Sequence, residues 1–425
     1  MNEMLETLGR NAKEAEIVLR NLDTAKKNQV LEAVADSLVA DSKALLTANA
    51  IDVENGRKNQ MPEGLVDRLM LTEARIASMA EGLRQVAALE DPIGEVTGMK
   101  KRPNGLLIGQ KRVPLGVIGI IYEARPNVTA DAFALCFKTG NVVILKGGSD
   151  TIHSNTAIVD CIRRTLDENG ITKDAIQLIS DTSRETAGEF MKMNEYVDVL
   201  IPRGGKGLIK AVVNNSTIPV IETGTGNCHI YADCDADPEM ARKIIVNAKT
   251  QRPSVCNAAE TLLVHRGIAE TFLPAAAQSL TQKGVELRCC EEAYRILERS
   301  GVPENRNLLK HAEESDWETE YNDLILAVKV VGDCAEAVAH TNTYGTGHSE
   351  AIVTENYEKA RYFQDHVDAA CVYVNASTRF TDGFEFGFGA EIGISNQKLH
   401  ARGPMGLKEL TTVKYVVNGS GQIRE

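Results

Sequence analysis

The chain has 425 residues, and its 47 Lys and Arg against 59 Asp and Glu give a formal net charge of −12. A hydrophobic content of 43% is ordinary for a globular protein and too high for a disordered one, and the length predicts two or three domains. The acidic balance argues against a general binder of nucleic acid or of an anionic membrane.

We also expect a soluble, cytoplasmic protein with no bound metal. The strongest apolar run, at 117–121, has the length of a buried strand and is far too short for a bilayer. The first residues lack the basic start and apolar core of a signal peptide. The nine cysteines include no Cys-x-x-Cys pair, and the adjacent Cys289 and Cys290 are poorly placed to hold one tetrahedral ion.

Helices are predicted through roughly the first 90 residues, because apolar residues recur there at the helical period. Asp23–Thr24 is a plausible cap for the second of them. Glycines and prolines then punctuate residues 94–114, where Asn104–Gly105 is a typical hairpin turn. We predict a protruding two-stranded ribbon over this segment.

Short apolar strands alternate with helical patterns from residue 113 onward. That alternation is typical of the doubly wound α/β class, a parallel sheet with helices on both faces and ligands at the carboxyl ends of its strands. The predicted strands are Val117–Tyr122, Val142–Leu145, Ile176–Leu178, Val197–Ile201 and Val220–Glu222, and the predicted helices are Val128–Lys138, Thr151–Glu168, Thr186–Met193 and Leu208–Asn214.

The alternation resumes after Asp237 and predicts a second α/β domain. Its strands are predicted at Thr261–His265, Leu324–Val331 and Cys371–Val374, and its helices at Pro238–Thr250, Ala269–Gln278, Glu291–Ser300, Ala335–Asn342 and Tyr357–His366. The tail from Glu409 is strand-like and is expected to form an exposed edge. An edge strand and a projecting ribbon are suited to pairing between subunits.

Basic residues beside glycines follow two of the predicted strands. Lys146 either reaches a phosphate or ribose above the sheet or is a solvated lysine in a tight turn. The segment Arg203–Gly207 lies between a strand and a helix, where glycines let backbone N–H groups approach an anion. For this second turn we favour an anion site over a flexible basic loop.

Cys256 has the surroundings best suited to a reactive thiol. Pro253 forces a non-helical approach to its loop, and Arg252 is placed to help hold a thiolate. Free cysteines are nevertheless more often core residues than nucleophiles. Earlier in the chain, Glu222 enters a glycine turn, where its carboxylate is a base, a ribose ligand or a polar cap.

These features together resemble the aldehyde dehydrogenase superfamily, and within it the gamma-glutamyl phosphate reductase (glutamate-5-semialdehyde dehydrogenase) family. The resemblance runs nearly end to end. It departs from the family signature at Thr341, where isoleucine is usual. The motifs that carry it are Tyr122-Glu-Ala-Arg-Pro-Asn-Val-Thr129, Leu145-Lys-Gly-Gly-Ser149, Ile201-Pro-Arg-Gly-Gly-Lys206, Glu222-Thr-Gly-Thr-Gly-Asn-Cys-His229, Gln251-Arg-Pro-Ser-Val-Cys-Asn257 and the segment 331–352 with His340 and His348.

The resemblance implies an aldehyde dehydrogenase-like fold of three parts. A nucleotide-binding domain comprises residues 1–95 and 114–227 with a segment near 390–406. A catalytic thiol domain spans 228–389. The ribbon at 96–113 and the terminal strand at 407–425 form a small β flap for oligomerisation. This division agrees with the alternation of strands and helices.

The implied reaction is NADPH-dependent reduction of gamma-glutamyl phosphate to glutamate-5-semialdehyde with release of phosphate, a step of proline biosynthesis. Cys256 is the implied nucleophile, forming a thioester that is then reduced. A homo-oligomer is expected, and a gamma-glutamyl kinase is a possible partner. The alternative from the same superfamily is a hydrolytic, NAD(P)-dependent semialdehyde dehydrogenase, in which Glu222 activates water.

The resemblance also assigns further site residues. Asn127 is the candidate for assisting the oxyanion, and Arg125 for binding the carboxylate or phosphate of the substrate. His348 is a candidate substrate ligand, although a structural histidine is the default for any one histidine alone. Glu320 matches the glutamate that holds the nicotinamide ribose, or else is a surface carboxylate before a strand. The cofactor-binding residues implied together are Lys146, Ser149, Arg203, Gly204, Gly205, Glu222 and Glu320.

Overall fold

The computed structural model describes residues 2–424 and divides into two compact units. The first unit comprises Met1–Thr223, Gly387–Gly393 and Met405–Glu425, and the second comprises Gly224–Phe386 and Ile394–Pro404. The second unit begins at residue 224, whereas the boundary that we predict from the sequence is at residue 228. Residues 394–404 group with the second unit, whereas we placed the segment 390–406 in the first.

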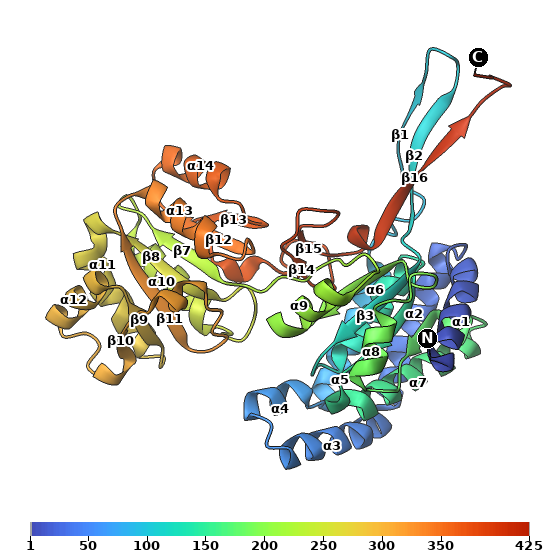
Figure 1. The fold of residues 1–425 in the computed structure, drawn as a ribbon, viewed down its shortest axis with the longest axis horizontal. Helices are drawn as coiled ribbons and strands as arrows, with labels where there is room; N and C mark the ends of the chain where they lie inside the picture. The colour runs from blue at the N-terminus through green and yellow to red at the C-terminus, as the bar shows by residue number, and fades with distance from the viewer. Residues whose placement is uncertain (1, 425) are drawn as a thin grey trace. The chain divides into compact units, whose positions relative to one another are not determined.

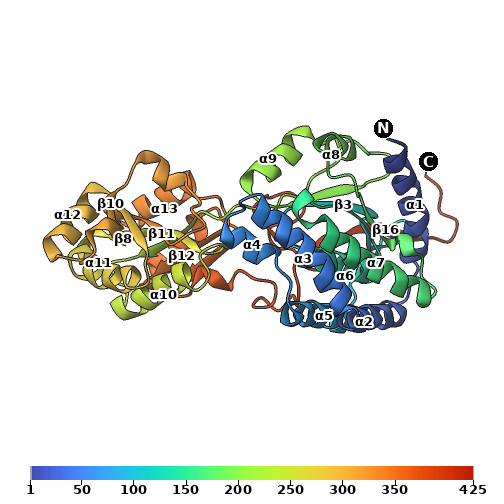
Figure 2. The ribbon, with the colours of Figure 1, turned by 90° about the horizontal axis from the view of Figure 1, so that it is seen from below.

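The segment Glu3–Ala88 is mainly helical, as predicted. Its helices are α1 (Glu3–Leu19), α2 (Thr24–Ala40), α3 (Ser42–Lys58), α4 (Glu63–Leu69) and α5 (Glu73–Ala88). The Asp23 side chain caps α2 by accepting a hydrogen bond from the Lys26 N–H, which confirms the predicted cap. Helix α2 packs side by side with α5, and both contact α6 (Asn127–Lys138) (Figure 2).

A four-stranded parallel sheet forms the centre of the first unit. Its strands β3 (Val117–Tyr122), β4 (Val142–Lys146), β5 (Ile176–Leu178) and β6 (Val199–Arg203) run in the order β5-β4-β3-β6. The intervening helices are α6 (Asn127–Lys138), α7 (Ile152–Glu168), α8 (Arg184–Phe190) and α9 (Lys206–Asn215). The prediction of a strand at Val220–Glu222 is wrong, because only an isolated bridge between Val220 and Leu200 forms there.

A seven-stranded parallel sheet forms the second unit, in the order β10-β9-β11-β8-β7-β12-β13. Its strands are β7 (Cys228–Ala232), β8 (Ala259–His265), β9 (Glu286–Cys289), β10 (Leu309–His311), β11 (Ile325–Val331), β12 (Ser349–Val353) and β13 (Cys371–Val374). Its helices are α10 (Pro238–Thr250), α11 (Arg266–Thr281), α12 (Glu291–Ser300), α13 (Cys334–Tyr344) and α14 (Tyr357–His366). Two two-residue strands, β14 (Ile394–Ser395) and β15 (Gly403–Pro404), pair separately.

Both faces of this second sheet are covered by helices. Leu262 and Val264 of β8 belong to a core shared with α10, α11 and α12, whereas Leu263 between them belongs to a core with α13 and α14. Alternate residues of a strand point to opposite faces, so these two cores lie on opposite sides of the sheet (Figure 1). The parallel sheets and their helices confirm the predicted α/β class.

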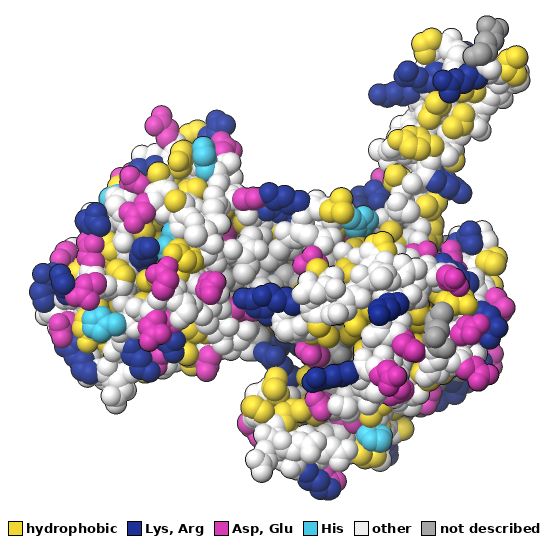
Figure 3. Space-filling view, viewed as in Figure 1, with side chains coloured by type: hydrophobic (Ala, Val, Ile, Leu, Met, Phe, Trp, Pro, Cys, Tyr) yellow, Lys and Arg dark blue, Asp and Glu magenta, His cyan; other side chains and the backbone are white. Residues whose placement is uncertain are grey.

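The predicted ribbon and tail form one three-stranded antiparallel sheet in the first unit. Strand β2 (Leu107–Pro114) lies between β1 (Val96–Lys101) and β16 (Thr411–Asn418), and Lys111 of β2 is opposite Val96 on one side and Lys414 on the other. This flap carries exposed apolar side chains along its length and basic side chains near its tip (Figure 3). Within residues 2–424, no helix is long and apolar enough to cross a bilayer.

Candidate active site

The loop that carries Cys256 joins α10 to β8 and is anchored at both ends by a buried ion pair. Lys249, at the end of α10, lies 2.5 Å from Glu260 at the start of β8, and both side chains are at most 1% exposed. The second oxygen of Glu260 accepts a hydrogen bond of 3.1 Å from the Asn322 N–H. Burial lowers the pKa of Lys249 and raises that of Glu260 to about 7, because both charged forms lose hydration.

The backbone of Cys256 rests on the turn that precedes β7. A Cβ atom on residue 226 would overlap the carbonyl group of Cys256, so only glycine fits there. The Gly226 N–H donates a hydrogen bond of 2.7 Å to a carboxylate oxygen of Glu320. The Cys228 thiol lies 3.2 Å from the Cys256 carbonyl oxygen. These contacts fix the backbone of the loop and leave the Cys256 side chain partly exposed.

Glu320 therefore binds the turn that contacts the thiol loop, within the second unit. Its contact with Gly226 makes it more than a surface carboxylate before a strand, because it holds the turn on which Cys256 rests. Its role toward a nicotinamide ribose stays a prediction.

His348 is completely buried next to the same loop. Its Nδ1 lies 2.8 Å from the Ser349 hydroxyl and 3.9 Å from the Cys228 sulfur. Burial lowers the pKa of His348 to about 4, so its imidazole is neutral at physiological pH. In this structure its Nδ1 contacts other side chains of the second unit, and a contact with substrate stays a prediction.

A second segment of the same unit faces the thiol loop. Asn257 donates a hydrogen bond of 2.8 Å to the Thr381 carbonyl and accepts one of 2.7 Å from the Thr378 hydroxyl at its own carbonyl. Arg379 lies between them in sequence and donates from Nε to the Gln251 side chain at 2.7 Å. Sequence reasoning missed Gly226, Cys228 and Arg379, and no local pattern in the sequence links Arg379 to the thiol.

Five of the predicted cofactor residues, Lys146, Ser149, Arg203, Gly204 and Gly205, lie at or just after the carboxyl ends of β4 and β6. Strand β3 pairs Ile121 with Lys146 on one side and Tyr122 with Arg203 on the other, so the two cations flank the end of one strand. Lys146 is 4% exposed, and its ammonium donates a hydrogen bond of 3.3 Å to the Gly147 carbonyl. Burial lowers its pKa, and Asp181 opposes that shift.

The glycine turn after β6 leads into α9, and Gly205 is the residue before its first turn. The Gly205 N–H donates a hydrogen bond of 3.2 Å to Glu123, and a Cβ atom on Gly204 would lie 2.6 Å from the same carboxylate. Ser149 is exposed and begins a short 3-10 helix (Ser149–Thr151) after β4. The turn is thus compact, as close approach of a ligand to backbone requires.

The remaining predicted residues of the first unit lie near the start of α6 and in the loop after α9. Asn127 donates a hydrogen bond of 3.0 Å to Asp131, whose pKa is raised to about 6 by burial against the opposing effects of Asn127 and Arg203. Arg125 is partly buried just before α6, and Glu222 lies in a loop rather than at the end of a strand. The oxyanion role of Asn127 and the roles of Arg125 and Glu222 stay predictions.

These residues fit a nicotinamide dinucleotide. A buried ammonium whose hydrogen-bond acceptor is the carbonyl of the next residue can bind a ribose hydroxyl or a phosphate at little cost. Lys146, Ser149, Arg203, Gly204 and Gly205 lie together at the edge where doubly wound sheets bind nucleotides. Cys256, Glu320 and His348 form a separate group in the second unit.

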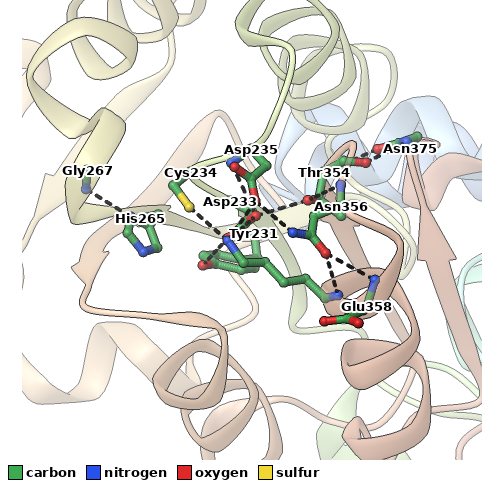
Figure 4. A network of polar contacts seen from close by, with 11 residues as sticks. Tyr231, Asp233, Cys234, Asp235, His265, Gly267, Thr354, Asn356, Glu358 and Asn375 are labelled. Atoms are coloured by element: carbon green, nitrogen blue, oxygen red, sulfur yellow. Dashed lines mark hydrogen bonds and ion pairs between the residues drawn. The ribbon is translucent and has the colours of Figure 1, made fainter.

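One group of potential metal ligands occurs within the described residues: Asp233, Cys234 and His265. Figure 4 shows these three residues together with Asp235. The Lys359 ammonium lies 3.0 Å from Asp233, 2.8 Å from the Cys234 sulfur and 2.9 Å from Asp235. Its pKa is raised by hydrogen bonds to these acceptors, although burial opposes the shift. A cationic side chain therefore pairs with two of the three potential ligands.

Comparison with known proteins gives a consistent result. The model of the Aldehyde dehydrogenase family matches residues 2–288 and 317–416. The chain is 58% identical to a gamma-glutamyl phosphate reductase of Lachnospira eligens, covering 100% of both chains, and 60% identical to one of Heliobacterium modesticaldum, covering 99% of both. The crystal structure of gamma-glutamyl phosphate reductase from Thermotoga maritima matches with a TM-score of 0.94 at 50% identity, covering 99% of this chain and 100% of that one. The predicted aldehyde dehydrogenase-like fold is thereby confirmed.

Proposed function

Since this chain belongs to the aldehyde dehydrogenase family, we propose that it reduces gamma-glutamyl phosphate to glutamate-5-semialdehyde, with NADPH as reductant and release of phosphate, in proline biosynthesis. The observation that supports this most is the similarity, along the whole chain, to proteins named for that reaction. The geometry around Cys256 agrees with it, because the loop is held rigidly while its thiol stays accessible.

In the proposed first step, the Cys256 thiolate attacks the carbonyl carbon of the acyl phosphate. The C–S bond forms, the C–O bond to phosphate breaks, and phosphate leaves with the bonding electron pair and takes up a proton from solvent. The backbone N–H of Cys256 and the side chain of Asn127 are the proposed donors to the oxyanion. Gly226 and Glu320 contribute by holding the peptide of Cys256 in place.

A nicotinamide cofactor, when bound, would supply the hydride for reduction of the thioester carbonyl. Cys256 then leaves with the electrons of the C–S bond, which releases the aldehyde and restores the thiolate. Lys146, Ser149, Arg203, Gly204 and Gly205 are the residues that we propose to hold the dinucleotide. The positive charges of Lys146 and Arg203 favour the cofactor that carries a 2′-phosphate.

We also propose a cytoplasmic location and a homo-oligomer. The nine cysteines include no Cys-x-x-Cys pair, which suits a reducing compartment. The flap presents Val413, Tyr415 and Val417 at alternate positions of its edge strand, with exposed fractions of 42%, 67% and 52%. Apolar side chains at alternate positions of an edge strand suit pairing with a second copy of the chain.

The test is NADP⁺ reduction by the purified protein with glutamate-5-semialdehyde, with and without inorganic phosphate. Turnover that requires phosphate supports the proposal, because phosphate then cleaves the thioester in the reverse direction. Turnover without phosphate contradicts it and means that water is the acceptor, as in the hydrolytic alternative.

Two cysteine variants complete the test. Cys256→Ala should abolish phosphate-dependent turnover. Cys290→Ser is the matched control, because the Cys290 sulfur caps α12 by accepting the Ala293 N–H, and a serine hydroxyl caps equally well. Unchanged activity in Cys256→Ala contradicts the covalent mechanism.

A further inference from the structure

Two arginines from different segments of the second unit lie close to Cys256. Arg252 belongs to the thiol loop itself, and Arg379 belongs to the facing segment that follows β13. The hydrogen bonds of Asn257 to Thr378 and Thr381 hold these two segments together. Arg379 Nε donates a hydrogen bond to Gln251, the neighbour of Arg252, and Arg379 is near enough to Arg252 and Cys256 for their charges to act on its pKa.

The pair carries two positive charges that are not neutralised. Among residues 2–424, neither Arg252 nor Arg379 forms an ion pair with a carboxylate. The nearby Asp382 accepts a hydrogen bond of 2.9 Å from the Phe384 N–H. Arg379 is partly buried, and its pKa is lowered by that burial and by the charge of Arg252, while Cys256 and Asp382 act in the opposite direction.

Arg379 is partly buried, whereas Arg252 is exposed. Placing the partly buried charge of Arg379 near a second cation costs free energy, which an anionic ligand would recover. We propose that Arg252 and Arg379 form the subsite for the phosphate group of the substrate. This inference rests on the proposed function, since it assumes an acyl phosphate at Cys256. Arginine is well suited to the task because its planar guanidinium donates two parallel hydrogen bonds to phosphate oxygens.

The charge of the pair selects the phosphate end of the substrate over its amino-acid end. The phosphate group is a dianion and matches two guanidinium charges. The other end carries an α-carboxylate and an α-ammonium group, so its net charge is zero and its ammonium would be repelled. With phosphate bound between the arginines, the negative charge that develops on the leaving oxygen as the C–O bond breaks is stabilised, and the electron pair departs with phosphate.

The reverse reaction separates the two ends, because phosphate and glutamate-5-semialdehyde are then separate substrates. In Arg379→Gln, the KM for inorganic phosphate should rise about tenfold or more, while the KM values for the semialdehyde and for NADP⁺ stay within about twofold of wild type. Arg252→Gln should act in the same way. A rise in the KM for the semialdehyde alone would assign the pair to the carboxylate, and a rise for NADP⁺ alone would assign it to the cofactor; either result overturns the proposal.

Matched controls keep the outcome clear. Arg379→Lys keeps the charge but loses the planar arrangement of hydrogen-bond donors. Its KM for inorganic phosphate should lie between those of Arg379→Gln and wild type. Arg361→Gln, an exposed arginine of α14 in the same unit, should leave all three KM values unchanged. Circular dichroism confirms that each variant is folded.

A binding measurement distinguishes failure of the subsite from failure of the proposed reaction. The rate at which iodoacetamide alkylates Cys256 is followed by mass spectrometry, with inorganic phosphate or with chloride at equal ionic strength. Phosphate should slow alkylation of wild type severalfold and leave Arg379→Gln unaffected. Equal protection in both proteins overturns the subsite, whereas a wild type without phosphate-dependent turnover overturns the reaction.

Discussion

Gly226 lies directly against the peptide of Cys256, so closely that a Cβ atom at position 226 would occupy the space of the Cys256 carbonyl group. The obstacle is backbone rather than the end of a flexible side chain, so it cannot move aside without moving the thiol. The Glu320 carboxylate holds the glycine in this position through the Gly226 N–H.

Gly226→Ala should therefore displace the loop and lower kcat by about a hundredfold, because a shift of about 1 Å near the reacting group has an effect of that size. Steady-state kinetics and circular dichroism measure this. The control is Gly188→Ala, where a Cβ atom meets nothing within 4 Å inside α8, and where alanine should leave kcat unchanged. Full activity in Gly226→Ala would show that the loop is not held by this contact.

Lys249→Met should destabilise the protein by about 3–5 kcal/mol, because it leaves the buried Glu260 carboxylate without its cation. Urea unfolding measures the loss. The double variant Lys249→Met/Glu260→Gln removes both charges and should recover part of it. The exposed pair of Lys58 and Glu54 is the control. Lys58→Met should have no measurable effect on the free energy of unfolding.

His348 should make the protein less stable in acid. Its pKa in the folded chain is lowered to about 4, against about 6.5 in an unfolded chain. Below pH 6.5 the unfolded chain binds a proton that the folded chain does not bind until about pH 4. The stability from this group is therefore complete above pH 6.5 and is lost as the pH falls from 6.5 to 4.

The variant His348→Gln tests this directly. Between pH 7 and pH 5 the free energy of unfolding should fall by about 2 kcal/mol less in the variant than in wild type. Urea titrations at the two pH values give the difference. An identical loss in both proteins would mean that the pKa of His348 is the same in the folded and the unfolded chain.

Lys146→Met should raise the KM for NADPH about tenfold and the KM for NADH much less, if its ammonium contacts the 2′-phosphate. Lys146 is buried and pairs with a neutral carbonyl, so the change should not destabilise the fold. Lys210→Met on the exposed face of α9 is the control for a lost positive charge. Equal effects on the two cofactors would place Lys146 at the ribose instead.

Local patterns were sufficient for most of the fold. The strand Val117–Tyr122 and the helices Pro238–Thr250 and Tyr357–His366 were predicted at the bounds that the structure shows, because each is a clear apolar run or a clear helical period. The hairpin turn at Asn104–Gly105 was equally recognisable, and Gly105 there has a φ of +90°.

Two of the missed strands contain buried polar residues. Strand β7 contains His229 and β12 contains Glu350, two side chains that are at most 1% exposed and lie 3.1 Å apart. Each residue interrupts an apolar run, and the hydrogen bond that makes its burial tolerable joins residues far apart in the chain. Such strands become recognisable only when both partners are known.

The same limit applies to the site. Cys256 and Lys146 stand in motifs that are visible along the chain. Arg379 and Gly226 are important because the fold brings them to the thiol loop, through hydrogen bonds that no spacing in the sequence specifies. The proposed phosphate subsite depends on tertiary contacts of this kind.

The pairing of β16 with β2 has a consequence for the order in which the chain folds. Lys111 of β2 pairs with Lys414 of β16, which follows the second unit in the chain. The second unit must therefore be synthesised before the flap can be completed. A nascent chain therefore exposes one edge of the β1–β2 hairpin throughout most of its translation. If the flap joins subunits, assembly is restricted to chains that have already made their catalytic loop, and incomplete chains are excluded from the oligomer.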